Sequence, residues 1–262
     1  MQLSPWHLLI SLMLVLSTAV SAVADTAVAN TAVADNNTAP ARSANTVMMG
    51  VHNFPPDFVV SQDGQDCGGD GAALARQIMA EAGLQLQTRC VTPARLYLLL
   101  EKGDIDLTIN IKSTAALSHQ PAPLFVEPPY MTLQLVLYSH KKTSPAPQDG
   151  SIAAIRAFDY QGQRQQLSAR GHQFVDVADA TGAIEVFLHR RTEHLLTYEG
   201  PFRAYLQNHD PSVLSQFERR EVDSIPAYFV VSPASPLQAR IAAAIRHYAS
   251  ARQCRFLRSC SG

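Results

Sequence analysis

Residues 92–111 read TPARLYLLLEKGDIDLTINI, and this stretch indicates an α/β fold. Thr92-Pro93 is typical of a helix start, because a hydroxyl side chain can cap the first turn and proline fits the first helical position. Leucines then recur at helical spacing as far as Gly103, a residue that commonly ends a helix. The residues after it, 105–111, are mostly apolar or β-branched. We therefore predict a helix followed directly by a buried strand.

The residues before this stretch repeat the same order of elements. Residues 46–52 form a β-type run that ends before two prolines, and residues 71–82 carry apolar side chains at helical spacing. Residues 84–91 alternate between apolar and polar side chains, as a half-buried strand does. The order strand, helix, strand, helix, strand with short connections predicts a parallel sheet with helices on both faces.

A second set of such elements follows the Lys- and Pro-rich segment 141–150. The predicted elements are strands over 152–157, 173–177 and 195–198, helices over 161–169, 181–190 and 202–207, a strand over 228–231 and a final helix to about residue 252. Two such sets predict two α/β lobes. Because ligands of open α/β sheets bind at the carboxyl ends of the strands, we expect a hinged cleft between the lobes.

Composition and motifs exclude several classes of protein. The chain has 262 residues, 47% of them hydrophobic, and a formal net charge of −1, so it is neither disordered nor a typical nucleic-acid-binding protein. It lacks the glycine-rich phosphate loops and the nucleophile elbow of common enzymes. His189, Glu193 and His194 have a spacing that differs from zinc-protease motifs, so we expect neither a metal nor a cofactor.

The amino-terminal residues indicate export. Residues 8–20 form a mostly apolar run before Ala22 and Ala24, a pattern typical of a cleavable secretory signal over residues 1–24. An uncleaved anchor is the alternative. Residues 25–45 repeat the sequence Thr-Ala-Val-Ala and predict a low-complexity linker. We therefore expect a periplasmic protein.

The four cysteines fit an oxidising compartment. Three pairings are possible, and we favour Cys67 with Cys90 and Cys254 with Cys260. Cys67 precedes a predicted helix and Cys90 ends the next predicted strand, and these two points lie at the same edge of a βαβ sheet. Cys254 and Cys260 flank a short turn after the last helix. Free buried thiols are the alternative.

A series of short motifs then suggests a family. In chain order they are Gly50-Val51-x3-Pro55-Pro56-x-Phe58, Asp63-Gly64, Gly68-Gly-Asp70, Leu74-Ala75-x2-Ile78, Gly83, Gly103-Asp104-Ile105-Asp106-Leu107 and Phe125-x4-Tyr130. With these motifs residues 46–140 resemble the bacterial extracellular solute-binding protein family 3, the periplasmic components of ABC transporters for amino acids and similar solutes. From residue 141 to about residue 250, only the order of helices and strands resembles that of the family.

The resemblance implies a two-lobed periplasmic-binding-protein-like fold of type II, with a flanked sheet in each lobe and a hinged cleft. It also implies that the first lobe is discontinuous. We expect residues 46–138 and 228–262 to form lobe 1, and residues 139–227 to form lobe 2.

The resemblance also implies ligand-binding positions. Phe54 lies where the family has an aromatic lid over the ligand, and Asn110 and Ser113 lie at its polar positions after the third strand. Tyr198, with Glu199 beside it, lies where the family has an acidic residue for an α-ammonium group.

The arginine with which the family binds an α-carboxylate is missing, and its position corresponds to Ser118 or His119. Lys112 is the nearest substitute cation, although an ammonium lacks the two-pronged geometry of a guanidinium. Arg156, at the end of the first strand of lobe 2, is a further cation. We therefore include Lys112, His119 and Arg156 among the predicted ligand-binding residues.

Together these features predict a monomeric exported protein that is not an enzyme. It would capture a small polar solute, an amino acid or related organic anion, for a membrane ABC permease or a membrane sensor. One alternative is a dehydratase-like enzyme on the same scaffold, with Glu199 and either Lys112 or His119 as its acid/base pair. Another is a sensory or interaction module that has lost solute binding.

Overall fold

The computed structural model describes residues 43–141, 150–156 and 158–260, so the predicted signal and most of the predicted linker lie outside the described residues. The main strands are β1 (Thr46–Val51), β4 (Gln85–Cys90), β5 (Leu107–Ile111), β6 (Leu124–His140), β7 (Ser151–Ile155), β8 (Gln173–Val177), β9 (His194–Tyr198) and β10 (Phe217–Val231). The helices are α1 (Asp70–Glu81), α2 (Pro93–Lys102), α3 (Gln163–Ala169), α4 (Ala180–Leu188), α5 (Glu199–Gln207) and α6 (Gln238–Ala251). Short elements are β2 (Val59–Val60), β3 (Cys67–Gly68) and the 3-10 helices η1 (Ala115–Leu117), η2 (Pro211–Gln216) and η3 (Leu257–Cys260).

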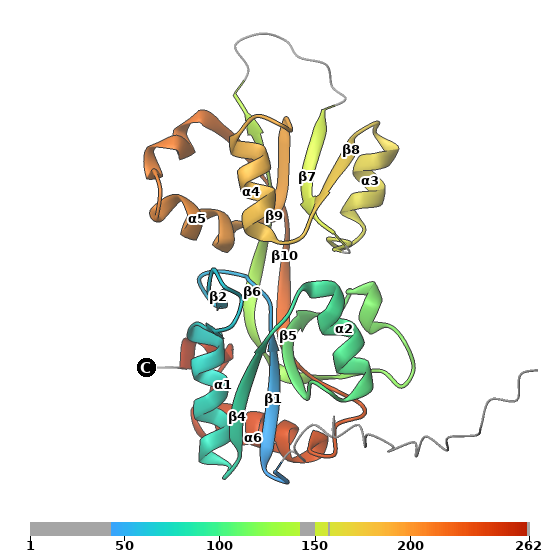
Figure 1. Ribbon diagram of the computed structural model, residues 1–262, viewed down its shortest axis with the longest axis vertical. Helices are drawn as coiled ribbons and strands as arrows, with labels where there is room; N and C mark the ends of the chain where they lie inside the picture. Colours follow the sequence, from blue (N-terminus) through green and yellow to red (C-terminus); the bar gives the residue numbers. More distant parts are fainter. Residues whose placement is uncertain (1–42, 142–149, 157, 261–262) are drawn as a thin grey trace, which may run out of the picture. The chain divides into compact units, whose positions relative to one another are not determined.

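The main strands form one eight-stranded sheet in the order β4-β1-β5-β10-β6-β9-β7-β8 (Figure 1). Strands β6 and β10 are antiparallel and pair from Phe217 with His140 to Val231 with Leu124. At one end β10 also pairs with β5, and at the other end β6 also pairs with β9. We call the elements β1, β4, β5, α1, α2 and α6 lobe 1, and the elements β7, β8, β9, α3, α4 and α5 lobe 2.

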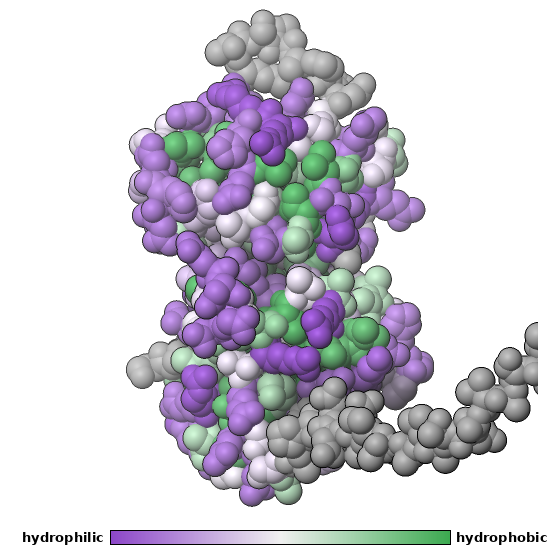
Figure 2. Space-filling model, viewed as in Figure 1, coloured by the Kyte–Doolittle hydropathy of each residue, from purple (hydrophilic) through white to green (hydrophobic). Residues whose placement is uncertain are grey.

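Helices cover both faces of the sheet in each lobe, and the side chains of the strands alternate between these faces. In β1, Val47 and Met49 pack with the apolar residues of α1 and α6, whereas Met48 packs with those of α2. In β6, Val136 belongs to the cluster under α4 and α5, and Leu137 lies on the opposite face. Figure 2 shows hydrophilic residues over most of the visible surface, with hydrophobic ones in smaller groups.

The predicted order matches the structure for strands β1, β4, β5, β7, β8 and β9 and for helices α1 to α5. Gly103 ends α2 in the left-handed conformation, with a φ of 77°, as its position in the sequence suggests. The main difference concerns β10, which starts at Phe217 although we expected a strand only over 228–231. Its first half contains exposed charged residues, and Pro226 interrupts the β-type pattern, so only its pairing with β6 identifies this part as strand. Since β6 and β10 continue through both lobes, the two expected sheets are one.

The disulfides join Cys67 to Cys90 and Cys254 to Cys260, the two pairings that the sequence favours. The first connects β3 to the end of β4, and the second holds the turn between α6 and η3. No free cysteine occurs among the described residues.

We predict that the double substitution Cys67→Ser/Cys90→Ser lowers the free energy of unfolding by about 3 kcal/mol, because the bond closes a long loop in the unfolded chain. The matched variant Cys254→Ser/Cys260→Ser opens a much shorter loop and should lower it by about 2 kcal/mol on the same entropic argument. Urea unfolding under non-reducing conditions measures both values. A larger loss in the second variant would contradict the prediction.

Candidate functional site

The main candidate site is a pocket at the carboxyl ends of strands from both lobes, where ligands of α/β sheets bind. Its walls come from the segments that follow β1, β5 and β7, from the ends of β5 and β9, from the middle of β6 and β10, and from Tyr97 of α2. The cavity volume is about 50 Å³. A small solute therefore fits this pocket better than a peptide.

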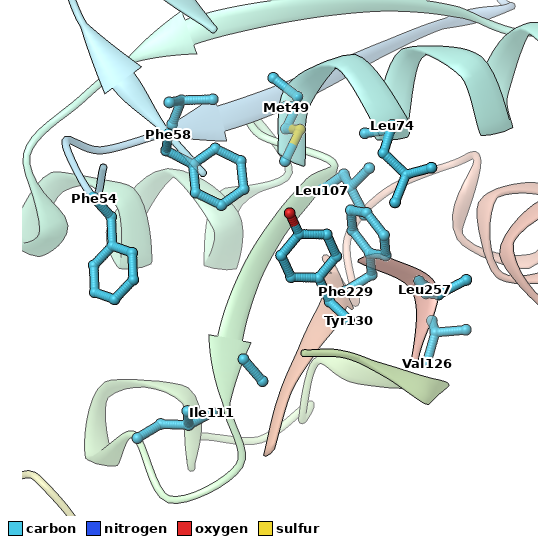
Figure 3. Packing of buried hydrophobic residues seen from close by; sticks show 14 of the residues in the cluster. Met49, Phe54, Phe58, Leu74, Leu107, Ile111, Val126, Tyr130, Phe229 and Leu257 are labelled. Atoms are coloured by element: carbon cyan, nitrogen blue, oxygen red, sulfur yellow. The ribbon is translucent and has the colours of Figure 1, made fainter. Parts of the chain in front are cut away.

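Aromatic rings form much of the pocket wall and bring the two lobes into contact. The ring of Phe54 from lobe 1 lies 5.5 Å from that of Tyr198 in lobe 2, measured between centroids. Phe158 and Tyr160 continue the cluster, with centroids 6.4 Å and 5.8 Å from Tyr198. Phe58 and Tyr130 add two rings on the side of lobe 1. Figure 3 shows Phe54, Phe58 and Tyr130 beside the hydrophobic core of lobe 1.

A buried carboxylate lies at the lobe 1 end of the pocket. Asp57 is only 2% exposed, and its Oδ1 accepts a hydrogen bond of 2.7 Å from the hydroxyl of Tyr130. The guanidinium Nε of Arg258 lies 3.0 Å from the same oxygen. Burial raises the pKa of Asp57, against the opposing effects of Tyr130 and Arg258. Arg258 belongs to η3, so this ion pair also connects the carboxy-terminal turn to the pocket.

A second carboxylate, Asp159, lines the pocket from lobe 2. Its Oδ2 accepts a hydrogen bond of 2.7 Å from the backbone N–H of Gly162. The turn between them is unusual, because the φ angles of Tyr160 and Gln161 are 53° and 60°, in the left-handed region that non-glycine residues seldom adopt. The Tyr160 hydroxyl accepts a hydrogen bond of 2.8 Å from the N–H of Ile155, which anchors the turn to β7.

At the end of β5 and directly after it, uncharged polar side chains also line the pocket. Asn110 donates to the hydroxyl of Tyr97 at 3.2 Å and accepts from the hydroxyl of Thr114 at 2.7 Å. The hydroxyl of Ser113 is buried and has no hydrogen-bond partner among the described residues. A buried hydroxyl without a partner is costly, so a bound solute would be expected to satisfy it.

His52 completes the pocket next to the aromatic cluster. Its ring makes edge contacts with Phe54 and Phe158, at centroid distances of 6.0 Å and 6.1 Å. Burial lowers the pKa of His52 to about 4, although the nearby charge of Asp179 opposes this shift. The imidazole is therefore neutral at physiological pH and adds no positive charge to the pocket.

The structure brings together four of the eight residues predicted to bind the ligand. Phe54, Asn110, Ser113 and Tyr198 all line this pocket, and the other four do not. Lys112 is exposed, pairs with Glu127 at 2.9 Å and lies over the ring of Tyr228, 4.2 Å from its centroid.

The remaining three predicted residues lie elsewhere. His119 is exposed and borders a separate hollow beside α2. Arg156 is also exposed, and its backbone N–H donates to the carbonyl of Val177. Glu199, at the start of α5, borders a neighbouring shallow pocket rather than the main one.

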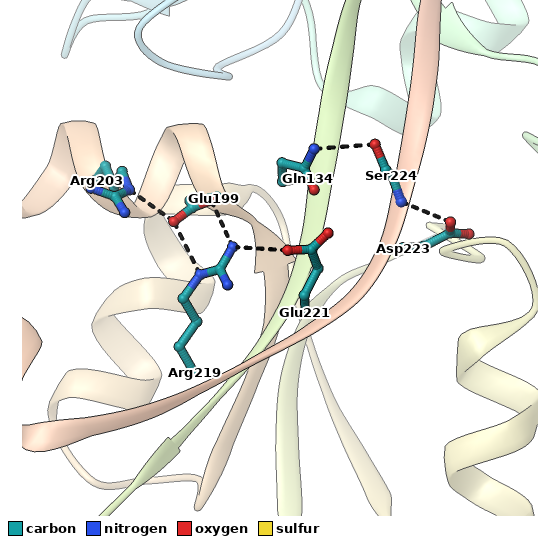
Figure 4. A network of polar contacts seen from close by, with 7 residues as sticks. All are labelled: Gln134, Glu199, Arg203, Arg219, Glu221, Asp223 and Ser224. Atoms are coloured by element: carbon teal, nitrogen blue, oxygen red, sulfur yellow. Dashed lines mark hydrogen bonds and ion pairs between the residues drawn. The ribbon is translucent and has the colours of Figure 1, made fainter.

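Glu199 belongs to a network of ion pairs (Figure 4). It accepts hydrogen bonds of 2.8 Å from Arg203 and of 3.1 Å and 2.9 Å from Arg219, a residue of β10. The pKa of Glu199 is lowered, since these hydrogen bonds outweigh the opposing effect of burial. Both of its oxygens are thus used to attach α5 to β10.

Sequence reasoning missed several pocket residues, notably Asp57, Asp159, Phe158 and Tyr160. The last three directly follow the predicted strand 152–157, and the rule that ligands bind at carboxyl ends of strands could have identified them. Asp57 lies between Pro56 and Phe58 of the quoted motif, but nothing in the sequence indicates that it is buried.

Metal-binding clusters and membrane-spanning helices are absent from the described residues. No three side chains of the types that bind metals lie close enough together to hold an ion. No helix in the described part of the chain has the length and apolar character needed to cross a membrane.

Comparison with known proteins reveals similarity of structure without similarity of sequence. No protein-family model and no curated protein sequence matches the chain. Solved structures do match. One is a histidine kinase sensor domain with similarity to periplasmic binding proteins, which has a TM-score of 0.65 and 16% sequence identity. The match covers 83% of this chain and 94% of the sensor domain.

Two further similar structures contain bound amino acids. An ancestral arginine-binding protein bound to arginine has a TM-score of 0.64 and 15% identity, over 79% of this chain and 93% of its own. The GluR0 ligand-binding core complexed with L-glutamate has a TM-score of 0.63 and 16% identity, over 81% and 96%. These similarities confirm the predicted fold class, a two-lobed α/β fold like that of periplasmic binding proteins.

We predict that His52 makes the stability of the protein depend on pH. Its pKa is lower in the folded protein, about 4, than the usual 6.5, so between these values the unfolded chain binds more protons. The free energy of unfolding should therefore fall as the pH decreases from 6.5 to 4, by up to about 3 kcal/mol from this residue. His52→Phe should keep the ring packing and reduce this slope in urea unfolding at several pH values. An unchanged slope would contradict the assignment.

Proposed function

We propose that this protein is an exported solute-binding protein, which closes its two lobes over a small polar solute and presents it to a membrane transporter or sensor. The observation that carries the proposal is the pocket at the carboxyl ends of strands from both lobes, with the buried, unpartnered hydroxyl of Ser113 in its wall. The fold of the similar solved structures supports the same function.

Closure requires a hinge, and the pairing of the strands suggests its position. Strand β10 pairs with β5 from Ala227 onward, and β6 pairs with β9 from Leu135 onward. Residues 132–134 and 224–226 lie between these regions and would form the hinge. The sequence suggested that lobe 1 consists of residues 46–138 and 228–262, and lobe 2 of residues 139–227. With this hinge, each boundary between the lobes moves by a few residues.

A hydrogen bond between the lobes supports closure as the binding step. The side-chain amide of Asn53, after β1, donates to the hydroxyl of Thr181 in α4 at 3.0 Å. Together with the contact between Phe54 and Tyr198, it joins the two sides of the pocket. A solute held between these walls would be shielded from water on both sides.

The proposed location follows from the sequence. Residues 1–24 would act as a secretory signal and residues 25–45 as a linker, so the folded part would lie in the periplasm. The two disulfides fit that oxidising compartment.

Binding fits the site better than catalysis does. The acid/base candidates Glu199, Lys112 and His119 border three different parts of the surface, and the first two are in ion pairs. General acid/base catalysis requires two such groups within hydrogen-bonding reach of one substrate.

We predict that one or more solutes in a panel of amino acids, organic acids, amines and polyamines will stabilise the purified chain against heat. A solute at 100 times its Kd adds about 2.7 kcal/mol, which corresponds to a rise in Tm of about 5–10 °C for a protein of this size. Phe158→Ala removes a half-buried ring from the pocket and should abolish most of the shift. Leu98→Ala, at an exposed position on α2, is the matched control and should keep it.

The result could contradict the proposal in two ways. No shift with any solute would favour an interaction module without solute binding. A shift of equal size in the Phe158→Ala variant would show that the solute binds elsewhere.

A further inference from the structure

The main pocket has an unusual charge for a site that would bind amino acids. Its lining includes two carboxylates, Asp57 and Asp159, and neither lysine nor arginine is among the described residues that line it. The imidazole of His52 is the remaining basic group, and burial lowers its pKa to about 4. The wall thus carries negative charge without a positive group to bind an anion.

The two carboxylates differ in how their charge is balanced. Asp57 is paired with Arg258 at 3.0 Å, and the hydroxyl of Tyr130 donates to it. Asp159 accepts one hydrogen bond from the backbone of Gly162, and within the described parts of the chain no lysine or arginine forms an ion pair with it. Asp159 is therefore the group that a positively charged solute would neutralise.

Two aromatic residues adjoin Asp159 in the chain and line the same pocket. Phe158 and Tyr160 are its neighbours in the chain, their ring centroids are 5.7 Å apart, and both rings lie near Tyr198. The faces of such rings attract ammonium and guanidinium groups through their quadrupoles. A carboxylate of the solute in the same place would instead face the negative charge of Asp159. It would lose its hydration without forming an ion pair in exchange.

The wall on the side of lobe 1 completes the description of the solute. Asn110, Ser113 and Thr114 are uncharged, and the Ser113 hydroxyl is buried with no partner among the described residues. These groups suit a hydroxyl, amide or ether in the solute. An α-carboxylate would ordinarily require an arginine there.

We propose that the solute is a small organic cation whose other groups are uncharged, with its positive charge between Asp159 and the rings of Phe158, Tyr160 and Tyr198. This proposal rests on the proposed function, because it assigns the class of solute to the same pocket. It replaces the amino acid expected from the family resemblance and the organic anion expected from Lys112 and Arg156. Both cations lie outside the pocket.

Matched pairs of probes that differ by a carboxylate test the proposal. We would measure calorimetric binding of the purified full chain to tyramine and tyrosine, ethanolamine and serine, and choline and glycine betaine. In the pair that binds best, the cation without a carboxylate should bind at least tenfold more tightly than its partner. Benzoate and malonate serve as anionic probes and should not bind.

Variants of Asp159 test the position of the charge. Asp159→Asn keeps an oxygen that can accept from Gly162 and should weaken binding of the best cation at least tenfold. Asp159→Glu keeps the charge and should retain more of the affinity. Asp63→Asn, in an exposed turn outside the pocket, is the matched control and should bind like the unchanged protein. Thermal unfolding without solute checks that each variant is folded.

The outcomes distinguish the proposed cationic solute from the proposed solute-binding function. Tighter binding of an amino acid or an anion would overturn the cationic class but retain the solute-binding function. Equal binding by Asp159→Asn and the unchanged chain would overturn the role of Asp159. Absence of binding by every probe and every solute of the wider panel would overturn both proposals.

Discussion

Strands β6 and β10 pair with each other over nearly their whole lengths, and every other strand of the main sheet is attached to one of them, directly or through a neighbour. This pairing determines the rest of the structure. Strands β5, β1 and β4 extend the sheet from β10, and β9, β7 and β8 extend it from β6. Because the two sets attach at opposite ends of the long pair, their carboxyl ends face each other, and the pocket lies where they meet.

The charged residues of the protein are placed so that few of them face this pocket. Glu199 and Arg219 attach α5 to β10, Lys112 pairs with Glu127, and Arg258 neutralises Asp57. In each case a group that could have bound a solute is used within the protein. Selectivity would then depend on one carboxylate, Asp159, and on the rings and uncharged polar groups around it.

Sequence reasoning predicted the elements of each lobe well, because their signals are local. Apolar periodicity, the start at Thr92-Pro93 and the end at Gly103 identify α2 and its neighbours without knowledge of the fold. The first half of β10 was missed because its exposed residues and Pro226 form a strand only through pairing with a distant segment. Among the residues that line the pocket, Phe54, Asn110, Ser113 and Tyr198 were predicted because they lie at the ligand-binding positions of the resembling family.

By itself the sequence determined the α/β class and the order of most helices and strands, it favoured the observed pairs of cysteines, and it named four of the residues that line the pocket. These properties depend on neighbouring residues or on short motifs. Only the tertiary structure decided which charged groups reach the pocket, because ion pairs such as Arg258 with Asp57 and Arg219 with Glu199 join segments far apart in the chain. The sign of the charge in the pocket, and hence the class of solute that we infer, follows from those pairs.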